Sequence, residues 1–182
     1  GNKKDFLDLI SLIYGNPIKI DLIRVNERYC ANITNIGFDR RVVSAKNRLR
    51  KLHIVPAGLA YIGGVILSLI FIKKEILHFT FEDGTQSSNR LLLTLFANGA
   101  YYGGGFKACA EADLTDGIFD LMIVPPVGRL RFLSLVGRYK KGEIMQTKFK
   151  DQIIYRKCKS LEITKATPIR YCLDGEILTA SK

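Results

Sequence analysis

The stretch Leu77-His78-Phe79-Thr80-Phe81-Glu82-Asp83-Gly84 sets the pattern of the fold. Its apolar side chains alternate with His78 and Thr80, which is the period of a strand with one buried face, and Asp-Gly is a frequent hairpin turn. The apolar run Leu91 to Phe96 follows. We therefore predict a β-hairpin between these two segments.

Short strand patterns recur along the chain. Phe119, Leu121 and Ile123 share one face of a strand that the pair Pro125-Pro126 ends. Further strands are predicted at Ile18–Val25, Tyr29–Ile36, Ile153–Cys158, Leu161–Thr164 and Ile169–Leu173. Many short strands between turn signals predict an α+β, mainly β fold: an antiparallel β-sandwich with a few helices. The length suits one well-cored domain, and no linker interrupts it, so we expect a single domain over residues 1–182.

Two segments have the spacing of amphipathic helices. The first is Asp5–Tyr14, which Gly15-Asn16-Pro17 ends. The second runs from Arg129 to Lys141, with Leu130, Leu133 and Val136 predicted to face inward and Arg131, Arg138 and Lys141 on another face. This basic helix is either an ordinary solvated helix or a surface that settles against anionic lipid.

The run from Val55 to Ile72 is uncharged and close to the length of a membrane-spanning helix. Pro56, Gly63, Gly64 and other breakers interrupt it, and strand patterns continue on both sides. We favour a buried helix over a transmembrane segment.

The charge and the cysteines limit the partners. The formal net charge of +11 should attract anions such as phosphate-bearing substrates and acidic lipid headgroups. Nucleic acid is not expected, because the basic residues are scattered and no nucleic-acid motif accompanies them. The four cysteines form no CxxC pair, which argues against a zinc site or a disulfide framework and favours a reducing cytosol. No signal peptide opens the sequence, in agreement with a cytoplasmic location.

One region combines glycines with acidic side chains. It reads Ala97-Asn98-Gly99-Ala100-Tyr101-Tyr102-Gly103-Gly104-Gly105 and, shortly after, Glu111-Ala112-Asp113-Leu114-Thr115-Asp116-Gly117-Ile118-Phe119-Asp120. The glycines lack the Lys-Ser/Thr of a phosphate-binding loop, so a close-packed turn is the better interpretation. Asp116 follows Asp113 by three residues, and carbonyls with a carboxylate in a tight turn would suit Mg²⁺ or Ca²⁺.

A second acidic turn, Leu173-Asp174-Gly175-Glu176, lies near the end. Asp-Gly is first of all a turn signal. The two carboxylates would also suit phosphoryl transfer, where one holds Mg²⁺ or its water shell and the other accepts a proton from the attacking hydroxyl.

Taken in order, these pieces resemble the C-terminal domain of the diacylglycerol kinase catalytic family, which includes bacterial soluble lipid kinases and the sphingosine and ceramide kinases. The resemblance covers almost the whole chain. The matching pieces are Gly1-Asn2-Lys3-Lys4-Asp5-Phe6, Ile20-Asp21, Asn35-Ile36-Gly37-Phe38-Asp39, Asn98-Gly99, Gly103-Gly104-Gly105, Ala112, Asp116-Gly117 and Asp174-Gly175-Glu176.

The resemblance implies a two-domain kinase that transfers the γ-phosphoryl group of ATP to a lipid hydroxyl. Its C-terminal domain is a β-sandwich of the NAD kinase/diacylglycerol kinase-like architecture. By matching positions, Glu176 would be the proton acceptor and Asp174 would help to place Mg²⁺-ATP. A structural Mg²⁺ would be held by the Asp116 carboxylate and the backbone carbonyls of Asp113 and Ile118. An aspartate of the other domain is the alternative base.

The family's nucleotide motif, Gly-Gly-Asp-Gly-Thr, belongs to an N-terminal domain and is absent from this sequence. The expected partners are therefore that N-terminal nucleotide-binding domain, a lipid substrate of unspecified type and the anionic inner face of the membrane. The chain alone should be inactive, and a homodimer is left open. The alternatives are a non-catalytic lipid or membrane-surface binding module and a relative of NAD kinase.

Overall fold

The computed structural model describes residues 13–37, 75–102 and 105–180. Ile13 and Tyr14 are helical. From β1 onward, the described elements follow one another along the chain as strands broken by one α-helix and two short 3₁₀ helices. These are β1 (Ile23–Val25), β2 (Arg28–Cys30), β3 (Ile33–Gly37), β4 (Glu75–Phe81), β5 (Gln86–Leu91), β6 (Leu93–Ala97), β7 (Phe119–Val124), α4 (Arg129–Lys141), η2 (Ile144–Gln146), η3 (Lys150–Gln152), β8 (Ile154–Cys158), β9 (Leu161–Thr164), β10 (Ile169–Leu173) and β11 (Glu176–Ala180).

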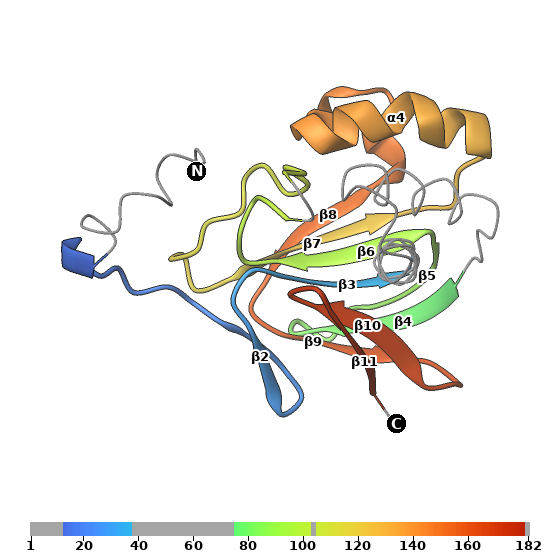
Figure 1. Cartoon of the computed structure of the whole chain (residues 1–182). Helices are drawn as coiled ribbons and strands as arrows, with labels where there is room; N and C mark the ends of the chain where they lie inside the picture. Colours follow the sequence, from blue (N-terminus) through green and yellow to red (C-terminus); the bar gives the residue numbers. More distant parts are fainter. Residues whose placement is uncertain (1–12, 38–74, 103–104, 181–182) are drawn as a thin grey trace, which may run out of the picture.

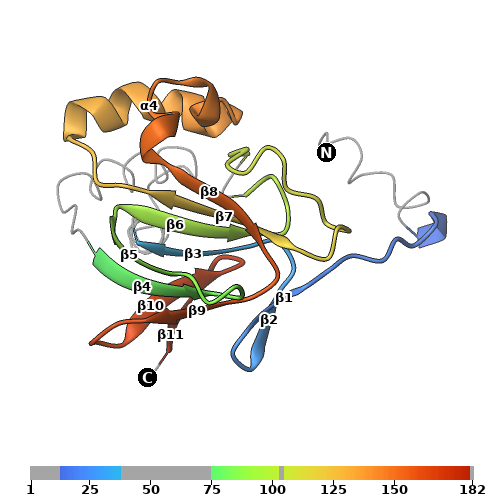
Figure 2. The same ribbon diagram turned by 180° about the vertical axis from the view of Figure 1, so that it is seen from behind.

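The elements form three layers (Figures 1 and 2). The middle layer is a six-stranded sheet in the order β11-β10-β3-β6-β7-β8, and a three-stranded sheet, β5-β4-β9, covers one of its faces. Helix α4 covers the other face, and β1 and β2 form a separate hairpin. Every strand pair is antiparallel. The predicted mainly β antiparallel sandwich is confirmed, while the extent of the domain over residues 1–182 stays a prediction.

The central strands of the middle sheet, β3, β6 and β7, are buried on both faces, and their side chains alternate between two cores. From β7, Leu121 and Ile123 pack with Phe79 between the two sheets. Met122 and Val124 point the other way, into the core under α4. The predicted common face of Phe119, Leu121 and Ile123 is confirmed.

The predicted hairpin begins correctly at β4 but has a different second strand. β4 pairs with β5, so that Phe79 lies opposite Ser87, whereas the apolar run that contains β6 belongs to the middle sheet between β3 and β7. The physical reason is burial. β5 is a sheet edge with alternate residues exposed and is therefore polar, while all of β6 is buried.

Other strand predictions differ at particular points. Only Ile23–Val25 of the predicted strand Ile18–Val25 is a strand, and Tyr29–Ile36 is split into β2 and β3. The break falls at Ala31 and Asn32, whose amides bond to a carboxylate instead of a neighbouring strand. β7 ends before the proline pair as predicted, β8, β9 and β10 lie within a residue of their predicted bounds, and β11 was not predicted.

Helix α4 has the predicted bounds, but the inward assignment of Leu130 and Leu133 is wrong. Leu130 is 84% exposed and Leu133 54% exposed. Phe132, Leu135 and Tyr139 pack on the core instead, because their i, i+3, i+7 spacing forms the wider apolar stripe.

Some predictions lie outside the described residues. These are residues 5–12 of the first helix and the apolar run Val55–Ile72. Within the described part of the chain, no helix is long and apolar enough to cross a bilayer.

A substitution of Gly37, the last residue of β3, tests how closely β3 packs against the neighbouring segment. Its φ is +104°, and a Cβ there would lie 2.4 Å from the Leu92 carbonyl oxygen. Gly84 also has a positive φ, +79°, but a Cβ there would meet nothing within 4 Å. We expect Gly84→Ala to destabilise the chain by about 1 kcal/mol through backbone strain. Gly37→Ala should destabilise it by roughly 2 kcal/mol more through the clash. Urea unfolding measures both, and equal losses would contradict the contact.

Candidate functional site

The turn between β10 and β11 carries the first acidic pair. Asp174 and Gly175 have φ values of +44° and +98°, as in a two-residue hairpin turn in which both central residues are left-handed. Leu173 therefore pairs with Glu176. The turn leaves Glu176 exposed at the start of β11 and aims the Asp174 side chain at the connection between β2 and β3.

The Asp174 carboxylate binds that connection through its backbone. Its oxygens accept hydrogen bonds from the amides of Ala31 at 2.7 Å, Asn32 at 3.2 Å and Ile33 at 2.9 Å. The Cys30 thiol donates a fourth, at 3.1 Å. Burial, and then the neighbouring carboxylate, raise the pKa of Cys30 to about 12, so the thiol keeps its proton and remains a donor. A carboxylate with this many donors fixes the start of β3 against the β10–β11 turn.

The Asn98-Gly99 pair continues the network after β6. The Asn98 amide donates to the Asn32 carbonyl at 2.8 Å, and its buried side chain donates to the carbonyls of Asp21 at 2.6 Å and Ala31 at 3.0 Å. A Cβ on Gly99 would lie 2.3 Å from the Asn32 Oδ1. A larger residue would therefore displace the Asn32 side chain, whose Nδ2 donates to the Tyr101 carbonyl at 2.7 Å. The close-packed turn that the sequence favoured for this loop fits this contact.

Asp21 connects this network to the turn that holds Asp113 and Asp116. Its amide donates to the Leu114 carbonyl, and its Oδ2 accepts from the Gly117 amide, both at 2.7 Å. Within the turn, the Asp113 Oδ1 accepts from the Thr115 hydroxyl at 2.8 Å and from the Thr115 amide at 2.9 Å. These two hydrogen bonds lower the pKa of Asp113 below its usual value.

Asp116 lies beside a lysine and a second, buried carboxylate. The Lys157 Nζ is 3.1 Å from the Asp116 Oδ2 and 3.6 Å from the Asp120 Oδ2. Asp120 is 1% exposed and also accepts a 2.5 Å hydrogen bond from the Tyr155 hydroxyl. The hydrogen bond to Asp116 is the main cause of a raised Lys157 pKa, so the ammonium stays charged between the two carboxylates.

The donor set of the predicted metal site consists of hard oxygens, which suit Mg²⁺. Among the described residues, no hydrogen bond ends on the carbonyl oxygens of Asp113 or Ile118, so both are free to accept a ligand. The Asp116 Oδ1 accepts only a long hydrogen bond, 3.2 Å, from the Ile118 amide. In the described part of the chain, no three Cys, His, Asp or Glu side chains gather as a metal cluster.

The structure links two of the acidic turns that the sequence predicted as sites, whereas one predicted site residue, Glu176, lies outside the link. A continuous series of hydrogen bonds runs from Asp174 through Asn98 and Asp21 to the Asp113–Ile118 turn. Glu176 takes part in none of them. Sequence reasoning missed the linking roles of Asp21, Asn32 and Asn98, because each acts on the backbone of a segment distant in sequence. The only signals in the sequence are the Asn98-Gly99 and Ile20-Asp21 pairs, which belong to the pieces that carry the family resemblance.

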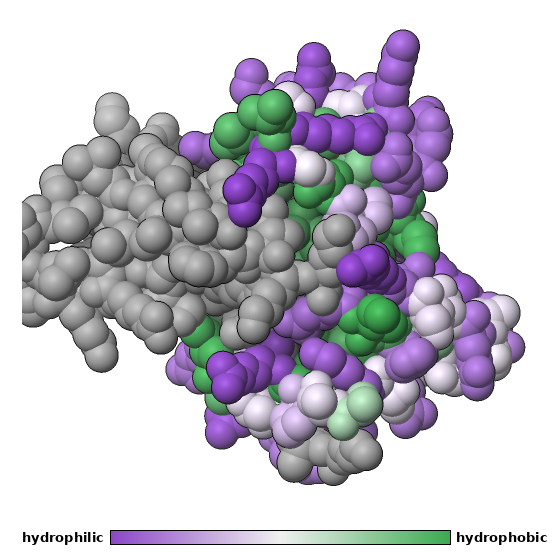
Figure 3. All heavy atoms as spheres, turned by 90° about the vertical axis from the view of Figure 1, so that its right-hand side faces the viewer, coloured by the Kyte–Doolittle hydropathy of each residue, from purple (hydrophilic) through white to green (hydrophobic). Residues whose placement is uncertain are grey.

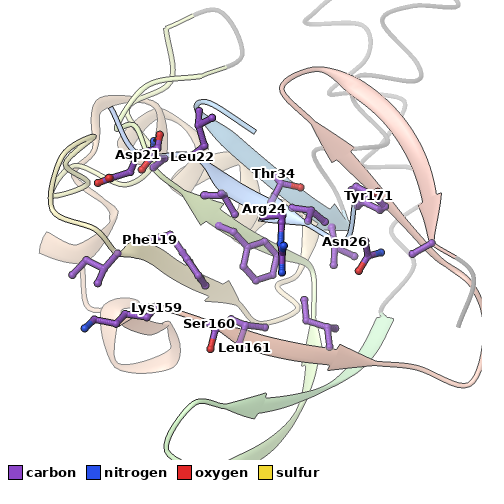
Figure 4. Close-up of a pocket in the computed structure, with 18 of the residues that line it drawn as sticks. Asp21, Leu22, Arg24, Asn26, Thr34, Phe119, Lys159, Ser160, Leu161 and Tyr171 are labelled. Carbon is purple, nitrogen blue, oxygen red and sulfur yellow. The ribbon is translucent and has the colours of Figure 1, made fainter. Parts of the chain in front are cut away.

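A cavity of about 540 Å³ opens beside this network (Figure 4). Its walls come from both sheets and from the β1–β2 hairpin, and they mix apolar with polar side chains. Phe119 from β7 and Leu161 from β9 are among the apolar ones, and Asp21, Arg24, Asn98, Lys159 and Ser160 are among the polar ones. A mixed lining of this kind suits an amphiphilic ligand better than a wholly polar one.

Comparison with known proteins gives consistent relatives. Residues 32–181 match the model of the YegS C-terminal NAD kinase beta sandwich-like domain. A protein named "Probable lipid kinase YegS-like" from Alcanivorax borkumensis is 29% identical over 170 residues, which are 93% of this chain and 55% of that protein. A diacylglycerol kinase from Staphylococcus epidermidis is 28% identical over 166 residues, 91% of this chain and 50% of the relative. The chain thus spans about half the length of these relatives.

The fold is also that of a solved structure. A diacylglycerol kinase from Bacillus anthracis str. Sterne superposes with a TM-score of 0.60 and 18% identity, over 94% of this chain and 50% of the other. At this identity the likeness shows the fold alone.

The two carboxylates of the acidic turn should differ in what they do for stability. Asp174→Ala removes the acceptor of several backbone amides, and we expect it to lower the free energy of unfolding by about 2 kcal/mol. Glu176→Gln changes an exposed side chain and should alter it by no more than about 0.5 kcal/mol. Chemical denaturation of both variants provides the comparison. An Asp174→Ala variant as stable as the wild type would show that these hydrogen bonds do not hold the turn.

Proposed function

This chain belongs to the YegS C-terminal NAD kinase beta sandwich-like domain family, and we propose that it forms the lipid-facing half of an ATP-dependent lipid kinase. The relatives carry the names lipid kinase and diacylglycerol kinase, which supports the assignment. Under this proposal the γ-phosphoryl group of ATP passes to the hydroxyl of a diacylglycerol-like lipid. A nucleotide-binding half supplies ATP, because its Gly-Gly-Asp-Gly-Thr motif is not in this sequence.

One observation carries the proposal: the cavity and the acidic network share residues. Asp21, Asn98, Gly117 and Ile118 line the cavity and also belong to the network or its metal turn. A lipid whose chain enters the cavity would therefore hold its polar end near the groups that the network positions. The charged side chains of Arg24 and Lys159 would favour a phosphorylated product or donor there.

The residues have separate roles in this proposal. Glu176 is the base that accepts the proton of the attacking hydroxyl, since its exposed carboxylate takes part in none of the network's hydrogen bonds. Asp174 is bound to backbone amides on both of its oxygens, so it would help to place Mg²⁺-ATP by fixing the turn that carries Glu176. Positioning of this kind accounts for much of the catalysis in phosphoryl transfer.

The Asp113–Ile118 turn is the proposed structural Mg²⁺ site. The Asp116 carboxylate and the carbonyls of Asp113 and Ile118 would be its protein ligands. Bound Mg²⁺ would add positive charge that holds these oxygens together. Lys157 already balances part of the negative charge next to Asp116.

The remaining parts of the proposal concern the location of the protein and the activity of this chain by itself. A lipid hydroxyl is presented at a membrane surface, so we place the protein in the cytoplasm, at the inner face of the membrane. Phosphoryl transfer needs nucleotide and hydroxyl in one cleft, and this chain by itself would be inactive.

The test is a lipid kinase assay on a protein in which this chain is joined to a nucleotide-binding half, with dioctanoylglycerol and NAD as alternative acceptors. We expect phosphorylated diacylglycerol, no phosphorylated NAD, and no product from the chain alone. Glu176→Gln should lower kcat by about a hundredfold or more, as for the loss of a general base. Glu162→Gln, which changes another exposed glutamate, on β9, is the matched control and should keep full activity.

Three results would contradict the assignment. Phosphorylation of NAD instead of lipid would favour the NAD kinase relative. Lipid binding without any transfer would favour a non-catalytic module. Full activity of the Glu176→Gln variant would transfer the role of base to another residue, such as an aspartate of the nucleotide-binding half.

A further inference from the structure

Helix α4 is the outermost layer of the molecule above the middle sheet (Figures 1 and 2). Its inner side is fixed by packing of Phe132, Leu135 and Tyr139 on the core and by a 2.5 Å hydrogen bond between the hydroxyls of Tyr139 and Tyr102. At its end, the Lys107 amide donates to the Lys140 carbonyl at 2.9 Å. No residue of α4 is fully buried, so the helix offers its whole outer side to solvent.

Two leucines occupy that outer side. Leu130 and Leu133 are one helical turn apart, and they are 84% and 54% exposed. On a helix of 3.6 residues per turn, Leu130 lies roughly opposite the inward-facing Leu135 and Tyr139. Packing within the described part of this chain therefore does not explain why these two exposed positions are leucines.

Cations surround the leucines, and the helix carries no Asp or Glu. The basic side chains of α4 are Arg129, Arg131, Arg138, Lys140 and Lys141. The space-filling view shows hydrophobic side chains among hydrophilic ones at the top of the molecule, where α4 lies (Figure 3). We call Leu130, Leu133 and these five cations the α4 face.

Helix stability explains only some of this charge. The cations Arg138, Lys140 and Lys141 at the C-terminal end interact favourably with the helix dipole. Arg129 and Arg131 lie in the first turn, where positive charge opposes the dipole and acidic residues are preferred. The helix dipole therefore does not account for the positions of these two arginines.

We propose that the α4 face binds the surface of an anionic lipid bilayer. Leu130 and Leu133 insert at the boundary between headgroups and acyl chains, and the surrounding cations contact acidic headgroups, as in other interfacial amphipathic helices. Ring contacts hold two of the cations at the flanks, with the Arg131 guanidinium 4.9 Å from the Phe149 ring centre and the Lys140 ammonium 5.7 Å from that of Phe106. The inference rests on the proposed function, because it names the surface that would make the membrane contact. Vesicle binding is measured without phosphoryl transfer, so a failure of the α4 face can be distinguished from a failure of the kinase assignment.

The experiment is co-sedimentation of the 182-residue chain with vesicles of phosphatidylcholine alone or with roughly one third phosphatidylglycerol. We expect binding to the anionic vesicles only, weakening as salt is raised because screening shortens electrostatic reach. Leu130→Ser with Leu133→Ser should weaken binding by roughly tenfold or more. Ile76→Ser, which changes an exposed residue of β4, is the matched apolar control and should bind as the wild type does.

A charge pair completes the test. Arg138→Gln with Lys141→Gln should weaken binding by roughly tenfold. Arg28→Gln with Arg170→Gln removes the same charge from β2 and β10, which lie away from α4 in Figure 1, and should have a much smaller effect. Circular dichroism and thermal unfolding verify that all variants are folded.

Several outcomes would overturn the proposal. These are equal binding to neutral and anionic vesicles, no vesicle binding, and equal losses for the α4 variants and their controls. A dimer that forms in solution and is abolished by the leucine variants, with no vesicle binding, would show that the α4 face binds a second copy of this chain.

Discussion

The structure depends on one carboxylate, that of Asp174, which joins the β10–β11 turn to the connection between β2 and β3. Asp174 accepts hydrogen bonds from the amides of Ala31, Asn32 and Ile33, and its own amide donates to the Ile33 carbonyl at 3.1 Å. These bonds fix β3 beside β10 in the middle sheet. They also position the carbonyls that Asn98 uses to connect with Asp21, and hence the Asp113–Ile118 turn. A single acidic turn therefore organises both the sheet and the candidate site.

In our proposal the two ends of the molecule have different tasks. The network and the cavity lie between and beside the two sheets, where apolar side chains meet oxygen-rich turns. The α4 face lies across the middle sheet from the three-stranded sheet, on the outside of the molecule. A protein that takes its substrate from a bilayer needs both a site for the lipid and a means of holding the membrane. Under the proposal, the cavity would serve the lipid and the α4 face would serve the membrane.

The sequence predicts the parts of this account that depend on local patterns. Alternation identified β4 and the inner face of β7, and proline ended β7. Alternation did not identify β5, whose exposed edge position makes it polar. Helical spacing did not place Leu130 and Leu133 correctly, because their spacing is compatible with either side of α4. The roles of Asp21, Asn32 and Asn98 could not be predicted, because they depend on backbone groups brought close only by the fold. The catalytic role of Glu176 and the metal ligands stay predictions that rest on the family resemblance.

The central claim is that the acidic turn and the Asn98 loop act as one unit through the Ala31–Ile33 connection. A double-mutant cycle with Asp174→Ala and Asn98→Ala, read from the free energy of unfolding, measures this directly. We predict a coupling energy of about 1 kcal/mol or more between them, and additivity for the control cycle of Asp174→Ala with Asp83→Ala, whose carboxylate lies in the β4–β5 turn. Additive effects of Asp174→Ala and Asn98→Ala, within about 0.5 kcal/mol, would contradict the claim.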